Sequence, residues 1–492
     1  MAESLRRQGA TGSRLIGWLG WAGLDALGRL ALLTGSTVVF SRLLGAHEFG
    51  VSALVLAIVA AASLFVGAPF EEALTRQRGL RRRHLRAALG VSWVAAIVLI
   101  AASGLAGRWL ATVFGEPEIA LLLPVTMVSI VFSAHSDIMT ALARRLKRFN
   151  DVAYATLMGH VIGICLALGL AFAGFGIWAL IGQRVLVVLA RAILLQRALG
   201  YLILPLWSPA DLRGLGRFAG LSFLSRLTEN LGYLAFNAIV QVIYGTQVLG
   251  HVNMAMRLIE PIRGAILATG HNLAFSYFAR SPDRHRLRER ARDVVAKAAL
   301  VTVPAFVGLA VVAPDLIPMM AGPGWEPAIA LAICLSLASA LAVPSALVYT
   351  AFSAAGRPEH SLASLVLGLI SSVIILVVCA PLGPISVGLS RLAGDGLRAL
   401  CAVVLPAAHL GWTRLARLDA LAHAWLLSAL MGLVTILLAA PAAAASHVLS
   451  LAIAVLLGVA VYALLLVAFA RSRLAEMARL AGIPVPGFLE RT

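Results

Sequence analysis

Long apolar runs separated by short polar turns recur along the whole chain. Apolar stretches of about 18 residues or more are long enough to cross a bilayer as helices. The turns between them carry helix breakers, such as Gly-Glu-Pro at 115–117 and Gly-Pro-Gly at 322–324. The pattern predicts an all-α polytopic membrane protein with about fourteen spans, which we expect at 15–41, 48–73, 85–107, 118–142, 150–172, 176–197, 217–244, 247–276, 293–313, 327–350, 361–380, 384–406, 420–440 and 447–470.

Composition agrees with this class. The chain has 492 residues, of which 61% are hydrophobic and 13% charged, whereas soluble domains carry about 25% charged residues. The four cysteines lie in apolar runs without paired spacing, so we interpret them as small buried hydrophobic residues. The sequence shows no nucleotide-binding loop, metal motif or nucleophile triad. We therefore expect no cofactor, no metal, no catalytic residue and no enzymatic activity.

The basic residues predict the orientation. Lysine and arginine number 40 against 22 acidic residues, and 30 of the 40 fall at the two termini and in alternate connections between spans. Positive charge favours the cytoplasmic side, so we expect both termini in the cytoplasm and the chain in the cell's inner membrane. Basic runs such as Arg81–Arg83 set topology and contact anionic lipid heads, and we expect no nucleic-acid partner. The first apolar run is expected to be a retained span and not a signal peptide.

Three local matches suggest an internal repeat. Gly45 and Gly50 match Gly245 and Gly250, and Glu116-Pro117 matches Glu326-Pro327. The third match pairs three residues of span 6 with three of span 12, namely Gly176, Arg184 and Arg191 with Gly383, Arg391 and Arg398. Six spans per repeat would give two lobes at 1–200 and 201–410, related by an axis along the membrane normal, with two extra spans and a cytoplasmic tail in 411–492. Chance similarity among turns is the alternative.

Polar residues within the spans are the candidate site, because a central charge costs about 2.5–3.5 kcal/mol to insert. Span 7 places a polar stripe on one helix face, and spans 1 and 8 carry further charges. A wet cavity between the lobes would use these residues. The substrate-binding candidates are Arg29, Arg226, Asn230, Tyr233, Asn237, Gln241, Asn253, Arg257 and Arg263, and the ion-coupling candidates are Asp25, Glu229 and Glu260.

Structural interpretations compete with these roles. Acids and arginines three or four positions apart could neutralise each other within one helix, and we favour this reading for Arg391 and Asp395. Arg184, Arg191 and Arg398 are interpreted as packing or snorkelling residues near a cytoplasmic end. His135, Asp137 and His160 could relay protons, but we favour hydrogen-bonded groups inside a bundle.

Several stretches resemble a known family. RLLGAHEFGVSALVLAIV at 42–59 resembles the first turn and second span of polysaccharide exporters, the Wzx-type flippases of the multidrug/oligosaccharidyl-lipid/polysaccharide (MOP) superfamily. YGTQVLGHVNMAMRLIEPI at 244–262 resembles the turn between their spans 7 and 8. GPGWEPAIALAICLSLASAL at 322–341, together with FSAAGRPEHSL at 352–362, resembles their spans 9 to 11. The resemblance covers roughly Leu30–Leu410, and its motifs concern packing and turns.

The resemblance implies a MATE-like fold and alternating access. It implies a cargo of glycan on polyprenyl pyrophosphate, and partner glycosyltransferases or a polymerase of the same pathway. The pyrophosphate would bind Arg29, Arg226, Arg257 or Arg263, since arginine binds phosphate in a bidentate manner. The alternatives are a multidrug cation antiporter, a peptidoglycan-precursor flippase or a membrane glycan polymerase.

Overall fold

The structure is a computed structural model of the chain. It describes residues 28, 30–67, 70–71, 74–75, 80–200, 203–208, 220–279, 281, 283–357, 359–409, 414–443 and 446–471. Nearly all of these residues are helical, and the chain divides into two compact units, the first ending at Asn253 and the second beginning at Met254. Asp25 and Arg29, two of the predicted site residues, lie outside the described residues.

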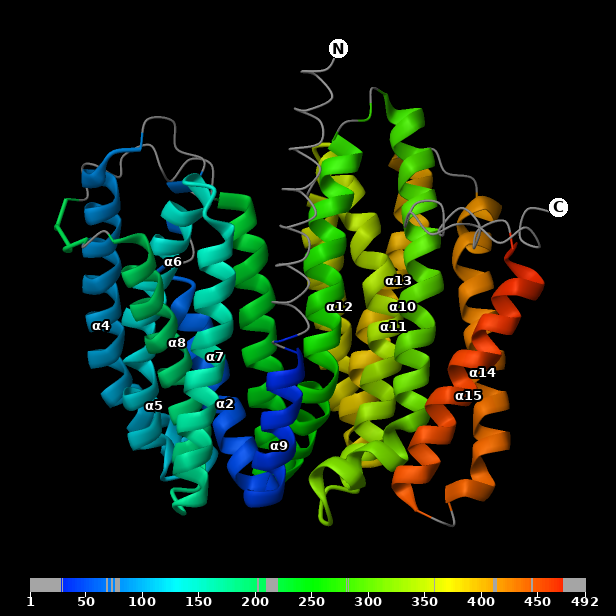
Figure 1. Cartoon of the computed structure of the whole chain (residues 1–492), viewed down its shortest axis with the longest axis horizontal. Coiled ribbons are helices and arrows are strands. Elements are labelled where there is room, and N and C mark those ends of the chain that lie inside the picture. The colour runs from blue at the N-terminus through cyan, green and yellow to red at the C-terminus, as the bar shows by residue number, and fades with distance from the viewer. Residues whose placement is uncertain are drawn as a thin grey trace, which may run out of the picture. The chain divides into compact units, whose positions relative to one another are not determined.

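The first unit is a helical bundle (Figure 1). A helix at Leu30–Leu43 precedes α2 (Ala46–Ser63), α4 (Arg82–Phe114), α5 (Ile119–Met127), α6 (Ser129–Arg145), α7 (Phe149–Phe172) and α8 (Ile177–Leu199). α7 packs along α8, and α6 packs against both α8 and α4. The bundle contains an apolar core that includes Leu85, Leu89, Ile138, Met139 and Leu195.

The long helix α9 (Gly220–Ala279) contains one break, at Gly245. Gly245 has φ 78° and ψ −179°, a conformation that is open to glycine and strained for other residues. The break joins two helical segments, one ending at Tyr244 and one beginning at Thr246. These segments correspond to the spans expected at 217–244 and 247–276.

The second unit contains the rest of α9 and six further helices. These are α10 (Arg284–Ala321), α11 (Pro327–Ala354), α12 (Glu359–Val378), α13 (Ile385–His409), α14 (Arg414–Ala443) and α15 (His447–Phe469), with the short 3-10 helix η2 (Ala380–Leu382) before α13. α11 packs against α10 and α13, α12 packs against α13, and α14 packs against α10 and α15. A buried cluster that includes Phe278, Tyr349 and Phe352 fills one part of this unit.

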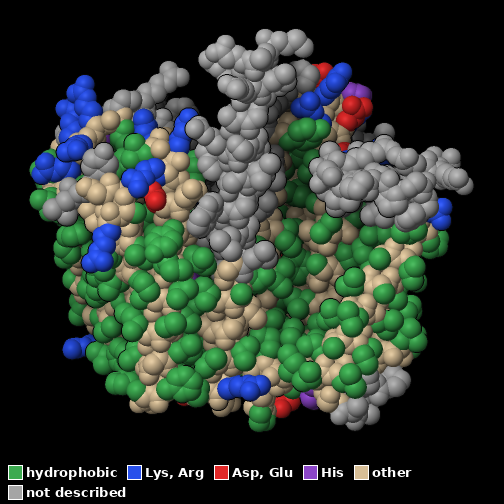
Figure 2. Space-filling model, viewed as in Figure 1, with side chains coloured by type: hydrophobic (Ala, Val, Ile, Leu, Met, Phe, Trp, Pro, Cys, Tyr) green, Lys and Arg blue, Asp and Glu red, His purple; other side chains and the backbone are tan. Residues whose placement is uncertain are grey.

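Each expected span overlaps a described helix or one segment of α9. Among the described residues, ten helices are long and apolar enough to cross a membrane. Their outer sides are apolar, as shown by the exposed Leu105 and Trp109 on α4 and Leu456 and Leu464 on α15. In the view of Figure 2, hydrophobic side chains cover the sides of the helices in each unit, while most Lys and Arg lie toward helix ends. The chain is therefore a multi-pass helical membrane protein.

Two glycines that the predicted repeat pairs have a positive φ in the structure. Gly176 precedes α8 with φ 55°, and Gly383 precedes α13 with φ 78°. In the first unit, a Cβ on Gly159 of α7 would lie 3.1 Å from the Cβ of Arg191 on α8. In the second, a Cβ on Gly368 of α12 would lie 2.6 Å from the Cγ of Arg398 on α13. In each unit, a glycine on the preceding helix thus admits the stem of one of the two arginines, Arg191 and Arg398, that the predicted repeat pairs.

Candidate functional site

The break in α9 lies in a polar cluster formed by three turns. The hydroxyl of Thr246, directly after Gly245, donates a hydrogen bond to a carboxylate oxygen of Glu116. The other oxygen of Glu116 lies 3.0 Å from Nε2 of His47, at the start of α2. Gln241 donates to the same Thr246 hydroxyl over 2.7 Å. Glu116 therefore joins the turn before α5 to the turn before α2 and to the break in α9.

Two glycines bring the same turns into backbone contact. A Cβ on Gly50 would overlap the backbone carbonyl of Thr246, and a Cβ on Gly250 would overlap that of Ala46. Both pairs are related by the 200-residue offset of the predicted repeat. The contact is therefore reciprocal, as it is at a two-fold interface where the same patch is used twice.

Burial of the polar stripe on the first segment of α9 increases along its length. Glu229 is exposed, and Asn230 and Tyr233 are half-buried. Asn237 and Gln241 are buried, and Nδ2 of Asn237 and Oε1 of Gln241 have no hydrogen-bond partner in the described part of the chain. Arg226 lies in the same helix, but its side chain is outside the described set. The buried end of the stripe adjoins Thr246 and the turn cluster.

The second segment of α9 carries the predicted arginines of span 8. Asn253 and Arg257 are half-buried. Arg263 is 15% exposed and donates from Nη1 to Glu260 over 3.1 Å, while Glu260 is 45% exposed. Glu260 and Arg263 are thus two candidates that lie in direct contact, and this ion pair can hold the guanidinium in place.

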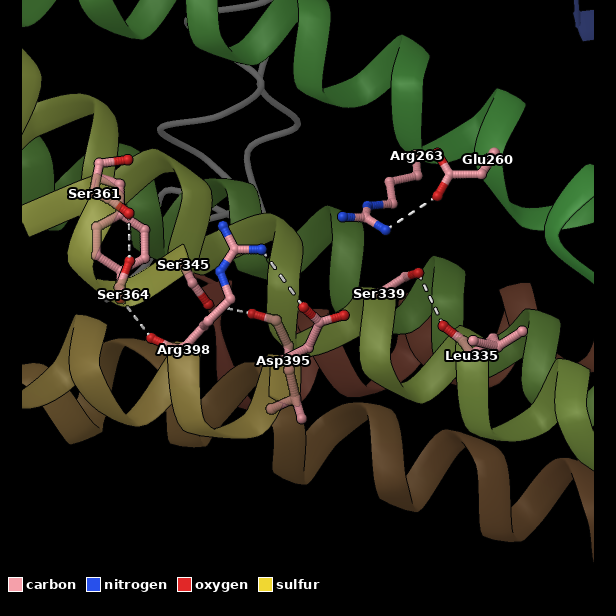
Figure 3. A network of polar contacts seen from close by, with 11 residues as sticks. Glu260, Arg263, Leu335, Ser339, Ser345, Ser361, Ser364, Asp395 and Arg398 are labelled. Atoms are coloured by element: carbon pink, nitrogen blue, oxygen red, sulfur yellow. Dashed lines mark hydrogen bonds and ion pairs between the residues drawn. The ribbon is translucent and has the colours of Figure 1, made fainter. Parts of the chain in front are cut away.

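A second arginine and carboxylate pair lies on α13. Arg398 Nη1 is 3.6 Å from Asp395 Oδ1, and the hydroxyl of Tyr349 on α11 donates to the Arg398 carbonyl over 2.7 Å. Figure 3 shows this pair and the Glu260 and Arg263 pair in one close view, with Arg263 extending from α9 in the direction of α11 and Asp395. Ser339 of α11 lies in the same region (Figure 3). The sequence analysis favours an ion pair between Arg391 and Asp395. In the structure, Asp395 forms an ion pair with Arg398.

The arrangement suits the binding of an anion. Two guanidinium groups with carboxylate partners of their own can exchange those partners for phosphate oxygens. Among the described residues, no group of three or more His, Cys, Asp or Glu side chains could hold a metal ion. In the second unit, the groups suited to an anion are thus the guanidinium groups of Arg263 and Arg398, on α9 and α13.

Another charged cluster lies in the first unit. The sequence analysis interprets its members as packing or hydrogen-bonded residues. Asp137 on α6 is surrounded by Glu71, Arg144, Arg184 and Arg191. Arg144 pairs with Glu71 at 2.7 Å, and Arg191 donates to the Thr140 hydroxyl over 3.0 Å. His135 is hydrogen-bonded to Gln196 at 2.9 Å, as expected of a bundle histidine. The sequence signal that could have identified this cluster is the presence of charged residues within two apolar helices, Asp137 in α6 and Arg184 and Arg191 in α8.

Comparison with known sequences identifies relatives. A family model described as a polysaccharide biosynthesis protein matches residues 39–330. The succinoglycan biosynthesis transport protein ExoT of Rhizobium meliloti (strain 1021) is 26% identical over 335 residues, which are 66% of this chain and 66% of that protein. The lipopolysaccharide biosynthesis protein WzxC of Escherichia coli (strain K12) is 22% identical over 333 residues, 66% of this chain and 65% of WzxC. The chain thus spans just under two thirds of the length of these relatives.

Solved structures share the fold. The lipid II flippase MurJ, in an inward closed conformation, has a TM-score of 0.74 with 14% identity, covering 93% of this chain and 99% of MurJ. An inward-facing MATE family multidrug resistance transporter of the MOP superfamily has a TM-score of 0.59 with 16% identity, covering 78% of this chain and 94% of the transporter. These likenesses confirm the predicted MATE-like fold. Because the family match covers more than half of the chain, the protein belongs to the polysaccharide biosynthesis protein family.

Proposed function

We propose that this protein translocates a polyprenyl-pyrophosphate-linked oligosaccharide or polysaccharide precursor across the membrane by alternating access. The observation that carries the proposal is family membership on a MATE-like fold. The names of the relatives ExoT and WzxC, a succinoglycan biosynthesis transport protein and a lipopolysaccharide biosynthesis protein, point to the same class of cargo. The protein would serve the synthesis of lipopolysaccharide, capsule or exopolysaccharide, and would act as a transporter and not as an enzyme.

The pyrophosphate head group is assigned to arginine. Arg263 is held by Glu260 at 3.1 Å, and Arg257 lies six residues earlier on α9. Guanidinium groups bind phosphate oxygens through two parallel hydrogen bonds, which ammonium groups cannot do. Arg29 and Arg226 are proposed for the same role from their positions in the sequence. Binding would release Glu260 from Arg263.

The glycan is assigned to the amide and phenol groups of α9. Asn230, Tyr233 and Asn253 are half-buried, so their polar atoms can reach sugar hydroxyls. The amides of Asn237 and Gln241 are buried, and each has one atom open to a further hydrogen bond. Asp25, Glu229 and Glu260 are the acids proposed to couple transport to an ion.

The architecture proposed for this cycle has two lobes, at 1–200 and 201–410, with two additional spans in 411–492. Both termini lie in the cytoplasm and the chain in the inner membrane, because basic residues concentrate in alternate connections. Glycosyltransferases and a polymerase of the same pathway are the proposed partners.

The test is deletion of the gene, followed by analysis of surface glycans and of lipid-linked intermediates. We expect loss of one surface glycan and accumulation of its lipid-linked precursor on the cytoplasmic side. Complementation with Arg257→Ala or Arg226→Ala should fail, while Arg286→Ala, an exposed arginine near the start of α10, should restore the glycan. Unchanged glycans in the deletion strain would overturn the proposal.

Two other cargoes give different results in the same strain. Lost efflux of organic cations with normal glycans would identify a multidrug antiporter. Arrested peptidoglycan synthesis with accumulated lipid II would identify a peptidoglycan-precursor flippase, a role that the fold likeness to MurJ also allows.

A further inference from the structure

A short segment of the connection between α8 and α9, residues 203–208, lies against the start of α4 (Figure 1). The backbone amide of Leu206 donates to the Arg86 carbonyl over 2.9 Å, and Nε of Arg86 donates to the Leu204 carbonyl over 3.3 Å. A Cβ on Gly90, four residues further along α4, would lie 2.3 Å from the Leu206 carbonyl oxygen. The segment is therefore docked on the helix by its backbone, and the glycine admits it.

The length of α4 places this contact at a membrane surface. α4 has 33 residues and is long and apolar enough to cross a membrane. Arg86 and Arg108 are both exposed, and the stretch of helix between them is about 33 Å long at 1.5 Å per residue. The hydrocarbon core of a bilayer is about 30 Å thick. Arg86 and the docked segment thus lie at one head-group level, on the cytoplasmic side in the proposed orientation.

The exposed side chains of the docked segment are apolar. Leu204, Leu206 and Trp207 are 57%, 40% and 61% exposed, whereas Ile203 is buried in the core of the bundle. Tryptophan is enriched at membrane interfaces, because its ring is apolar while its N–H can bond to polar groups. An exposed tryptophan between exposed leucines at this level therefore points to contact with lipid.

Positive charge surrounds the docked segment. Arg82, Arg83 and Arg86 are exposed on the first turns of α4. In the view of Figure 2, Lys and Arg side chains gather at this end of the first unit. Two acids at the same end, Glu71 and Asp151, are each paired with another arginine. The surface beside the segment is thus suited to an anionic head group.

The same face of α4 continues toward the middle of the membrane as an apolar surface. Steps of four and three positions from Gly90 lead to Val94 and Ile97, which are 42% and 59% exposed. Guanidinium groups at the surface and an aliphatic face below them match the phosphate and one acyl chain of a single phospholipid. An acidic protein partner would leave the aliphatic face unused, so a lipid is the favoured occupant.

We propose that the 203–208 segment and the start of α4 form a binding site for one anionic phospholipid. The lipid phosphate accepts hydrogen bonds from Arg83 and Arg86, Trp207 packs beside the head group, and one acyl chain lies on the exposed aliphatic face of α4. The general attraction of basic runs to anionic lipid needs charge alone, whereas this site also needs the docked segment. The site uses none of the residues proposed for the glycan and goes beyond the proposed function.

The test counts the lipids that the full-length protein retains in detergent, by native mass spectrometry. The probes are dioleoylphosphatidylglycerol and dioleoylphosphatidylcholine, which share their acyl chains and differ in net head-group charge. For the wild type, we expect about tenfold greater retention of phosphatidylglycerol. Arg83→Gln combined with Arg86→Gln should abolish this preference. Arg108→Gln, at the other end of α4, should leave it unchanged.

Two further substitutions separate a built site from general charge. Gly90→Ala keeps every arginine but places a methyl group on the Leu206 carbonyl, so it should displace the segment and lower phosphatidylglycerol retention at least threefold. Gly104→Ala is its matched control in α4, because a Cβ there meets nothing within 4 Å. Trp207→Ser, at an exposed position outside the helices, should lower retention to a similar extent even if the double arginine variant folds poorly.

Three results would overturn the proposal. Equal retention of the two lipids by the wild type would exclude an anionic site. Undiminished preference in the folded double arginine variant would exclude these arginines as the phosphate ligands. Wild-type retention in folded Gly90→Ala and Trp207→Ser would show that charge alone attracts the lipid and that the docked segment forms no site.

Discussion

Glu116 and Thr246 are joined by a hydrogen bond across 130 positions of sequence. The bond connects the turn before α5 to the break in α9, and His47 binds the same carboxylate from the turn before α2. Three turns that the basic-residue pattern places on one face of the membrane thus share one acid. In the alternating-access cycle that we propose, such a contact would stabilise the conformation in which these turns are together.

Replacement of Glu116 should weaken this conformation. Glu116→Ala leaves the Thr246 hydroxyl and the His47 ring without their acceptor, at a cost of about 1–3 kcal/mol. We expect a lower melting temperature in detergent and faster labelling of a cysteine introduced at Gln247. The matched control is Glu326→Ala at the repeat-related turn, where the carboxylate binds only the nearby Gly324 amide among the described contacts. Equal effects of the two substitutions would show that Glu116 serves only its own turn.

The paired glycines should tolerate no side chain. Gly50→Ala and Gly250→Ala each place a methyl group on the carbonyl of the opposing turn, and overpacking of this kind costs about 1–3 kcal/mol. Gly104→Ala in α4 is the control, because a Cβ there meets nothing within 4 Å and alanine favours helix. We expect lower thermal stability for the first two variants and unchanged or higher stability for the third. Wild-type melting of Gly50→Ala would contradict the close approach.

The repeat offset shows how far the sequence alone could lead. Gly50 and Gly250 could be matched by spacing, and both prove to be contact glycines, because a turn that must approach another backbone admits only glycine. Glu116 and Thr246 could not be joined in this way, since no periodicity links a turn residue to a helix break 130 positions away. The polar stripe of span 7 could be placed on one helix face, but burial of its Asn237 end depends on neighbours that helical spacing does not specify.

The last helix, α15, makes polar contacts with α10 that the sequence pattern did not reveal. Ser450 donates to Asp315 Oδ2 over 2.6 Å and His447 Nδ1 lies 2.8 Å from Oδ1, while the Tyr462 hydroxyl donates to the Leu300 carbonyl over 2.6 Å. These contacts join α15 to α10 at two levels. Tyr462→Phe should therefore cost about 1 kcal/mol and speed hydrogen exchange in α15. Tyr154→Phe, at an exposed tyrosine of α7, should leave exchange unchanged. Unaltered exchange in Tyr462→Phe would show that apolar packing alone holds α15.

Arg263 offers a test of whether the site recognises phosphate by geometry or by charge. Arg263→Lys keeps the positive charge and can still pair with Glu260, but it loses the planar fork that binds two phosphate oxygens together. Arg263→Ala loses both. If the pyrophosphate is bound in a bidentate manner, transport of the lipid-linked glycan should fall at least tenfold in both variants, because one lost charge-assisted hydrogen bond costs about 1.5–3 kcal/mol.

Arg290→Lys is the control, because Arg290 lies outside the proposed site. Its guanidinium carbon stacks 4.7 Å from the ring centroid of Tyr277, and its Nη1 donates a hydrogen bond to the Tyr277 carbonyl. Full transport by Arg263→Lys together with loss in Arg263→Ala would mean that charge alone is needed, and full transport by both would remove Arg263 from the head-group site.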